Sequence, residues 1–279
     1  MKNAVLCLLG IMTFPLGADE TVFAWKTGDF EVYTLVENRG PGRPGVLIDP
    51  PPAGVERYLE GGFESETNAF LIKAPGRVVL VDTGFGAALF DNLQALGVDP
   101  EQVDAVLITH MHGDHIGGLA RDGKALFPNA GVYLAEKERD FWTKTNLNRG
   151  AVEALAPYGG KVTVFRPGEL GGTALEILPG IKAAAAFGHT PGHTVFLLES
   201  RGEKLLIWGD LMHVQKIQFP MPAISVTYDT DPAEAAMSRI RILSYVAANG
   251  IPVAGMHLVY PAVGTVHSEG NGYRLQDAR

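Results

Sequence analysis

"LITHMHGDHIGGL", residues 107–119, is the part of the sequence with the densest set of metal-type side chains. The chain has 8 histidines in 279 residues, and three of them stand here beside an aspartate: His110, His112, His115 and Asp114. The residues in front of this cluster, 104–109, are mostly apolar and typical of a buried β-strand. The stretch therefore predicts a strand whose end carries metal ligands. The alternative is a turn that exposes histidines on the surface.

The spacing of these ligands favours two metal ions over one. In an extended backbone successive side chains point to opposite sides, so His110, His112 and Asp114 would share one side. His115 would point another way and serve a second ion. Imidazole suits zinc and its neighbours, and a carboxylate helps to fill a second site. The glycine pair 117–118 lets the backbone turn tightly beside the ions.

Three further candidates follow apolar strands elsewhere in the chain: His189 in "FGHTPGHT", Asp210 in "WGDL" and His257 in "GMHL". Each has another interpretation by itself, because an aspartate can cap a turn and a lone histidine is often structural. Ligands that arrive from separate strand ends at one edge of a sheet are a common arrangement in ligand sites. Together with the cluster, these residues predict one metal site built from distant segments.

The rest of the chain alternates strands and helices without a linker between them. A strand is expected over residues 29–40, a hairpin with a Pro-Gly turn over 67–84, a helix over 87–97 and a second hairpin over 194–211. The strands "GRVVLVDTG" and "EKLLIWGDL" are alike, as expected for a structure built from two similar halves. This pattern predicts a single α/β domain over residues 19–279.

The clearest helix in the sequence covers residues 231–250. Asp231 can act as the N-cap, Pro232 suits the first turn, and Glu234 completes the spacing of a capping box. A glycine at the last position suits the C-terminal turn. The apolar stripe expected on this helix consists of Ala236, Ile240, Leu243 and Ala247.

The N-terminal segment, "MKNAVLCLLGIMTFPLGADE", has the pattern of a secretory signal peptide over residues 1–18. A lysine precedes an apolar run, and small residues precede Asp19. The pattern predicts export to the periplasm or the medium, and the alternative is a buried N-terminal strand or helix. Cys7, the only cysteine, lies inside this segment, so the exported chain would contain no thiol. No other apolar stretch is long enough to span a membrane.

The composition is that of a folded, acidic protein. Hydrophobic residues make up 46% of the chain and charged residues 19%, which permits a sizeable core and argues against disorder. The net charge is −8, and no stretch is dense in lysine or arginine. A nucleic-acid partner is therefore not expected.

The motifs "THMHGDH", "GHTPGH", "GDL" and "GMH", with "VDTG" upstream, resemble those of the metallo-β-lactamase superfamily. The resemblance covers the chain after the signal segment and implies a four-layer αββα sandwich with a dinuclear metal site along one edge. It also implies two ligand sets that share a carboxylate: His110, His112 and His189 for one ion, Asp114, His115 and His257 for the other, and Asp210 as the bridge.

The resemblance implies supporting residues as well. In lactonase-like and glyoxalase-like members the first histidine of "HTPGHT" is the ligand. His189 would therefore bind metal, and His193 would stand behind it, oriented onto a carbonyl or carboxylate group. Asp82 of "VDTG" would likewise support a ligand, with a turn aspartate as the alternative.

"DFW" at 140–142, "FPNA", "PGIKA" and "GNGYR" resemble the methyl parathion hydrolase-like branch, which includes exported and lactonase-like members. That branch has an aromatic substrate pocket, to which Trp142 and Phe90 would contribute here. The chain is shorter than that branch between Asn148 and Pro157, where the branch supplies further aromatic residues. Phosphotriesterase activity is therefore less favoured.

A histidine takes the place of a family tyrosine near the predicted metals. In acyl-homoserine lactonases a tyrosine lies three residues after the bridging aspartate and helps to polarise the substrate carbonyl. His213 holds that place here and could do similar work, and the alternative is a histidine packed beneath the site. The predicted catalytic residues are Asp114, Asp210 and His213.

Two adjacent divalent ions can share a water as a bridging hydroxide, because they lower its pKa towards 7, and can clamp the attacked oxygen. The sequence thus predicts a dinuclear hydrolase of a small ester or lactone, acyl-homoserine lactones included. Zinc is the expected metal, with manganese, iron and cobalt as alternatives. Organophosphate triesters are the alternative substrates, and β-lactams rank low.

Other classes fit the residues less well. Flavodiiron-type redox proteins carry a glutamate where this chain has Gly113. A non-catalytic metal-binding protein would have lost ligands, and none of the seven is missing. Ribonuclease-type members are disfavoured by the charge and by the signal for export. The expected partners are a small-molecule substrate and a second copy of the chain in a homodimer.

Overall fold

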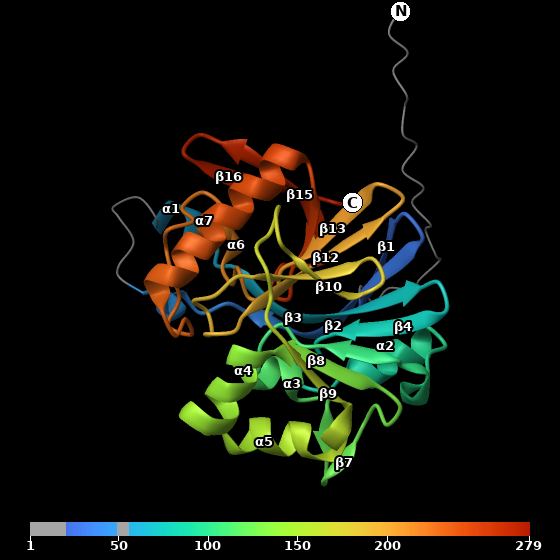
Figure 1. Ribbon diagram of the computed structural model, residues 1–279. Coiled ribbons are helices and arrows are strands. Elements are labelled where there is room, and N and C mark those ends of the chain that lie inside the picture. Colours follow the sequence, from blue (N-terminus) through green and yellow to red (C-terminus); the bar gives the residue numbers. More distant parts are fainter. Residues whose placement is uncertain (1–20, 49–55) are drawn as a thin grey trace, which may run out of the picture.

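Two seven-stranded β-sheets lie face to face, with helices on both outer sides (Figure 1). The structure is a computed structural model, and it describes residues 21–48 and 56–279. In spatial order, the first sheet contains β1 (Val22–Thr27), β2 (Phe30–Pro41), β3 (Glu64–Ala74), β4 (Arg77–Val81), β5 (Ala105–Leu107), β8 (Gly131–Ala135) and β9 (Val162–Phe165). The second contains β10 (Leu175–Leu178), β11 (Ile181–Ala185), β12 (Thr194–Ser200), β13 (Glu203–Ile207), β14 (Pro252–Ala254), β15 (Val263–Glu269) and β16 (Gly272–Asp277).

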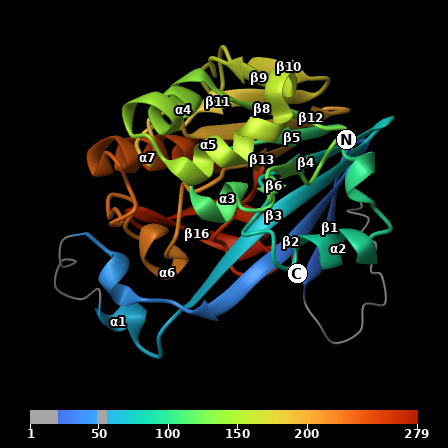
Figure 2. The same cartoon turned by 90° about the horizontal axis from the view of Figure 1, so that it is seen from below.

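Helices complete the four layers. The outer side of the second sheet carries α7 (Pro232–Asn249), and that of the first carries α2 (Leu89–Ala95), α3 (Gly113–Ile116), α4 (Glu136–Asp140) and α5 (Arg149–Leu155). Figure 2 shows α1 (Glu56–Leu59) at one end of the long strands β2 and β3, near α6 (Gln215–Gln218). The remaining short elements are β6 (Ala120–Arg121), β7 (Lys124–Ala125) and the helical turns Pro44–Val46, Pro100–Gln102, Phe141–Thr145 and Ala156–Lys161. The αββα sandwich predicted from the sequence is confirmed.

The two sheets share an internal arrangement. β3 and β4 form an antiparallel hairpin, and β5 pairs with β4 in parallel. In the second sheet β12 and β13 form the hairpin, and β14 pairs with β13 in parallel. The hairpins predicted over 67–84 and 194–211 are therefore confirmed. The likeness of "GRVVLVDTG" and "EKLLIWGDL" reflects equivalent positions of β4 and β13 in the two halves.

Alternating side chains of the first sheet enter two different cores. Phe70 and Ile72 of β3 pack against the second sheet, whereas Leu71 packs beneath the helices. The same alternation divides β5, because Leu107 lies between the sheets and Val106 lies beneath the helices. Both faces of these central strands are buried, which explains why the sequence shows continuous apolar runs rather than polar alternation.

Helix α7 forms where the sequence predicts it, but with a different buried face. Asp231 accepts two backbone hydrogen bonds, at 3.0 and 3.1 Å, and Gly250 ends the helix with φ 61, so both predicted ends are confirmed. The predicted apolar stripe is wrong in part, because Ile240 is 41% exposed. Arg239 lies on the buried face instead and donates a hydrogen bond to the carbonyl oxygen of Leu211 at 2.6 Å. A pattern of apolar residues cannot reveal such a buried polar anchor.

Two other predictions concern the ends of elements and of the chain. The helix predicted over 87–97 is confirmed as α2, after which Gly97 takes a φ of 65. The predicted signal peptide, residues 1–18, lies outside the described residues. Within residues 21–48 and 56–279, no helix is long and apolar enough to cross a membrane.

Candidate metal centre

The seven predicted metal ligands meet at one edge of the two sheets. His110 and His112 follow β5, His189 follows β11, Asp210 follows β13 and His257 follows β14. The other two predicted ligands lie on the short helix α3. Their ligand atoms form groups in which all atoms lie within 4.8 Å of one another. Four strand ends and one helical turn thus deliver all seven side chains to one place.

The backbone of the motif is extended up to His112, as predicted, but not beyond it. His112 is extended, with φ −67 and ψ 156, but α3 begins at Gly113. The His112 carbonyl oxygen accepts hydrogen bonds of 3.0 and 3.2 Å from the turn that follows, which makes that turn helical. A Cβ on Gly118 would stand 2.5 Å from a backbone carbonyl oxygen, so the turn also needs its glycine. The prediction that an extended backbone places Asp114 is therefore wrong. Asp114 enters the site beside His115, from a helical turn.

Three imidazoles and one carboxylate form the first ligand set. Nε2 of His110, Nδ1 of His112 and Nε2 of His189 lie 2.9, 3.0 and 3.1 Å apart. Oδ2 of Asp210 lies 3.5 Å from Nε2 of His110 and 3.3 Å from Nε2 of His189. Tetrahedral ligands about 2.0–2.1 Å from a zinc ion would be about 3.3 Å apart. A zinc ion therefore fits this set.

The second ligand set shares Asp210 with the first and adds Asp114, His115 and His257. Nε2 of His115 lies 3.7 Å from Oδ2 of Asp114 and 3.1 Å from Oδ1 of Asp210. Nε2 of His257 lies 3.5 Å from Oδ2 of Asp114 and 3.1 Å from Oδ2 of Asp210. Asp210 thus touches both sets. Which residues bind which ion stays a prediction.

Buried polar atoms without partners point to cations at this centre. Nε2 of His115 and Oδ1 of Asp210 are buried and lie 3.1 Å apart, but neither forms a hydrogen bond of acceptable geometry. Buried polar atoms in folded proteins are almost always paired, so this pair of atoms requires an explanation. Imidazole nitrogens and carboxylate oxygens are ligands that zinc, manganese, iron and cobalt accept. The residues present therefore fit divalent metal ions.

Several ligand imidazoles are held from behind by a second group. Nδ1 of His115 lies 2.7 Å from Oδ2 of Asp82, whose carboxylate also accepts two hydrogen bonds from Thr109. Nδ1 of His257 lies 2.6 Å from the carbonyl oxygen of Glu66. Such partners fix the orientation and tautomer of a ligand ring. Asp82 has a φ of 59, a conformation that is strained for most residues and often marks a functional site.

Two buried carboxylates at the centre are not among the residues that the sequence singled out. Oδ1 of Asp229 lies 2.9 Å from Nδ1 of His189, and Arg239 approaches the same carboxylate at 3.7 Å. Glu138 accepts a hydrogen bond of 2.9 Å from the backbone of Met111, which stands between two ligands. No motif marks either carboxylate. Glu138 lies in "EKERD", which has the composition of a solvent-exposed helix.

His193 lies behind the ligands, with both ring nitrogens engaged. Nδ1 lies 2.9 Å from the carbonyl oxygen of Ala186 and donates to it, and Nε2 accepts a hydrogen bond of 3.0 Å from the backbone of Asp210. No lone pair is left for a metal ion. Burial lowers the pKa of His193 to about 3, which keeps the ring neutral.

The electrostatics of the centre favour added positive charge. Burial, followed by the charge of His189, lowers the pKa of His112 to about 3. Burial opposes ionisation of Asp210, but the surrounding imidazoles outweigh it and hold the pKa of that carboxyl well below its usual value. Burial also opposes a charge on His115, yet the carboxylates of Asp210 and Asp114 raise its pKa well above its usual value. The carboxylates thus attract a cation to the place where the second ion would bind.

His213 lies beside Asp210 at the same centre. Its Nε2 is 3.0 Å from Oδ2 of Asp210, its ring stacks on that of His257 at 4.8 Å, and its buried Nδ1 has no partner. Burial lowers its pKa to about 4, so the ring is neutral. If Nε2 donates to Asp210, Nδ1 is an acceptor, and if Nε2 faces a metal ion, Nδ1 is a donor. The predicted donation to a substrate carbonyl requires a ring nitrogen that carries the proton.

An open cavity of about 600 Å³ reaches the metal centre. Its lining combines residues of the centre with aromatic side chains: Asp114, Asp210, His213, His257, Phe63, Phe85 and Tyr228. Phe90 does not line it, so that pocket prediction is wrong. The ring of Phe90 stacks on Phe127 at 5.7 Å in the core beneath the helices, because it lies on the packing side of α2. Phe85, which is 50% exposed, is the aromatic residue of this loop that lines the cavity.

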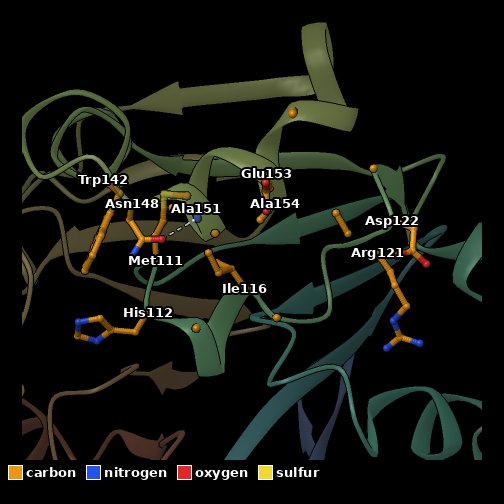
Figure 3. Close-up of a pocket in the computed structure, with 16 residues that line it drawn as sticks. Met111, His112, Ile116, Arg121, Asp122, Trp142, Asn148, Ala151, Glu153 and Ala154 are labelled. Atoms are coloured by element: carbon orange, nitrogen blue, oxygen red, sulfur yellow. Dashed lines mark hydrogen bonds between the residues drawn. The ribbon is translucent and has the colours of Figure 1, made fainter.

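A second cavity, of about 640 Å³, adjoins the first at His112 and Gly113. Trp142 lines this second cavity, with its ring 5.3 Å from that of His112 (Figure 3). Figure 3 shows Arg121 on the side of the cavity away from Trp142. The predicted pocket residue Trp142 therefore lies against the candidate ligand His112, in the neighbouring cavity rather than in the one that reaches the second set.

Comparison with known proteins agrees with this architecture. The sequence profile described as "Metallo-beta-lactamase superfamily" matches residues 62–247. Ribonuclease TTHA0252 of Thermus thermophilus is 31% identical over 193 residues, which are 66% of this chain and 42% of that protein. The chain therefore spans about two fifths of the length of this curated relative.

Two solved structures match nearly the whole chain. The hydrolase AbOPH in the beta lactamase superfamily has a TM-score of 0.83 and 30% identity, over 91% of this chain and 96% of its own. AidC, a dizinc quorum-quenching lactonase, has a TM-score of 0.82 and 24% identity, over 94% of this chain and 99% of its own. The likeness to AidC shows a common fold.

Proposed function

The chain belongs to the metallo-β-lactamase superfamily, and on that premise we propose that it hydrolyses a small ester or lactone with two divalent metal ions, zinc first among them. One observation carries this proposal. Asp210 lies between two ligand sets, at 3.3 Å from Nε2 of His189 and 3.1 Å from Nε2 of His257, where an open cavity meets the centre. A shared carboxylate of this kind is what a two-metal hydrolytic site requires.

Two ions bound here would activate a shared water near neutral pH and polarise the carbonyl group under attack. Other residues of the chain orient the side chains at this centre. The backbone of Asp210 is fixed by His193, so its carboxylate stays between the two sets. Asp82 holds the ring of His115, and His213 lies beside Asp210 in the lining of the cavity that would take the substrate.

The lining of the cavity favours a small substrate of low charge. Phe63, Phe85 and Tyr228 offer aromatic surface to an apolar group, as in most small-molecule sites. Arg43 is the single lysine or arginine in this lining. An RNA strand needs several cations along its phosphates, so the lining does not favour RNA, although one relative is a ribonuclease. Esters and lactones, including acyl-homoserine lactones, meet these conditions.

A substrate panel tests this proposal. Zinc-loaded protein would be assayed with acyl-homoserine lactones, other lactones, aryl esters, aryl phosphotriesters, β-lactams and a short RNA. The expected result is fastest turnover of a lactone or ester, lost in Asp210→Ala. Turnover of phosphotriesters or RNA above that of every ester and lactone would contradict the substrate class. Absence of all hydrolysis by protein with two metal equivalents would instead indicate a non-catalytic metal-binding protein.

A further inference from the structure

Glu138 on α4 is a fully buried carboxylate that accepts hydrogen bonds from four donors. Oε1 accepts from the backbone of Met111 at 2.9 Å and from Nε1 of Trp142 at 2.6 Å. Oε2 accepts from the hydroxyl of Thr190 at 2.7 Å and from the backbone of Gly192 at 2.9 Å. Three of these partners are N–H groups, which can only donate, so both oxygens of Glu138 serve as acceptors. No salt bridge pairs it with a cation in the part of the chain that the structure describes.

Three of the four donors come from the segments that carry the first ligand set. Met111 stands between His110 and His112, and the other segment begins at His189. A Cβ at Gly192 would overlap the backbone of Glu138, so α4 and this second segment are in close contact. One carboxylate therefore ties together two loops that lie almost eighty residues apart in the chain and hold all three histidines of the set.

His112 depends on this carboxylate in a second way. The outer nitrogen of His189 is held by Asp229 at 2.9 Å, but no hydrogen bond to Nε2 of His112 occurs among the described residues. The ring of Trp142 lies against that of His112 instead, at 5.3 Å and 72° (Figure 3). Because Glu138 holds Nε1 of Trp142, it also sets the plane against which His112 rests.

We propose that Glu138 is the positioning residue of the first ligand set, which it aligns through the backbone of Met111, the loop after His189 and the ring of Trp142. The inference rests on the proposed function only in that the set binds metal. It assigns to Glu138 a role at one ligand set and none at the other. A carboxylate with a merely structural role would weaken both sets alike, through the stability of the fold.

Glu138→Gln is the sharpest test, because it keeps the size of the side chain. The amide offers one acceptor oxygen, and its NH₂ group would face two of the four donors. A hydroxyl can rotate and accept, whereas the N–H groups of Met111, Trp142 and Gly192 cannot. The amide should therefore turn its NH₂ group towards Thr190, which leaves the N–H of Gly192 unpaired and loosens the segment that begins at His189.

The measurement is zinc affinity by chelator competition in metal-free protein, with cobalt substitution as a spectroscopic readout. Glu138→Gln should weaken one of two metal equivalents by about 10–100-fold, the usual effect of removing a group behind a ligand, and leave the other within threefold. The cobalt absorption bands of the weakened site should shift. Glu136→Gln, a change on the same helix at an exposed ion pair with Arg166, is the matched control and should alter neither equivalent.

A double-variant comparison identifies the affected set. In a His112→Ala background the first set is already broken, so adding Glu138→Gln should leave the remaining equivalent unchanged. Equal weakening of both equivalents, or a further loss in this background, would overturn the proposal. If Glu138→Gln does not fold, Trp142→Phe and Thr190→Val each remove one donor, and unchanged zinc affinity in both would overturn it as well.

These readouts do not involve a substrate. A protein that hydrolyses none of the tested compounds, yet loses one zinc equivalent on Glu138→Gln, would refute the proposed function and support the positioning role. The reverse result would do the opposite, so the two failures can be told apart.

Discussion

His189→Ala and His193→Ala should have different consequences, although the two histidines stand four residues apart in one loop. Nε2 of His189 lies within 3.0–3.3 Å of other ligand atoms of the first set. Both ring nitrogens of His193 already form hydrogen bonds, one to the carbonyl oxygen of Ala186 and one to the backbone N–H of Asp210. We therefore expect His189→Ala to lose one metal equivalent and nearly all hydrolysis, and His193→Ala to keep both equivalents but lose stability.

The size of the His193→Ala effect follows from its contacts. The change leaves the backbone N–H of Asp210 without a partner in a fully buried place, which costs about 1–3 kcal/mol. It also empties the volume of a buried ring, and the two costs together amount to about 3–5 kcal/mol. In a chain of this size each kcal/mol lowers the melting temperature by about 2–4 °C, so a fall of about 10 °C is expected. His193→Gln offers both a donor and an acceptor and should recover at least half of that fall.

Metal content and stability need separate assays, because bound metal itself stabilises the folded state. Elemental analysis after gel filtration gives the metal equivalents for each folded variant. Calorimetry of chelator-treated protein gives the melting temperature without that contribution. A folded His193→Ala protein with one equivalent, beside a His189→Ala protein with two, would refute the assignment of the two histidines. An unchanged melting temperature in His193→Ala would refute the energetic argument.

Four shorter predictions complete the tests. His213→Ala should keep two metal equivalents and its melting temperature while the kcat for a lactone falls about 10²–10³-fold, as for a lost donor to a developing oxyanion; loss of the second equivalent would identify His213 as a ligand instead. Phe85→Ala should raise KM with little effect on stability, whereas Phe90→Ala, in the core beside Phe127, should lower the melting temperature and leave KM unchanged; steady-state kinetics and calorimetry separate the two. Acidification should release metal, because protons compete for the imidazole of His115, whose pKa lies well above its usual value; equilibrium dialysis across pH 5–8 would show metal retention at low pH if this is wrong. Residues 1–18 should be absent from exported protein, and an intact Met1 peptide in mass spectra of periplasmic material would contradict that expectation.

The convergence of the candidate ligands was predictable because several of them follow buried apolar strands. His110, Asp210 and His257 come after β5, β13 and β14, where a run of hydrophobic letters stops at a metal-type side chain. Parallel pairing then brings such strand ends to the same edge. The local backbone was not predictable in the same way. Helix α3 covers only Gly113–Ile116, which is too short to show a periodicity.

The burial of two carboxylates, those of Glu138 and Asp229, could not be predicted from this sequence. Glu138 and Asp229 stand in charged or polar stretches, where an exposed position is the ordinary expectation. They are buried only because the chain brings donors to them from far away: Gly192 to Glu138, and His189 to Asp229. No local pattern encodes that convergence. The buried face of α7 was predicted wrongly for the same reason, because Arg239 is buried against the loop that carries Asp229.

Metal ligands and the residues that support them from behind differ in how they are placed in the fold. Most of the candidate ligands are placed by the end of a strand, so their positions leave a trace in the neighbouring sequence. A group behind the ligands needs only to meet them in space, and a side chain from any element can do so. Glu138 comes from α4 and Asp82 from the end of β4, yet each holds a ligand segment, at Met111 and at His115 respectively. In this fold the first kind of residue is therefore legible in the sequence. Of the second kind, Asp82 and His193 stand in recognisable motifs, whereas Glu138 and Asp229 require the three-dimensional structure. The substitution at Glu138 tests the part of the site that only the structure reveals.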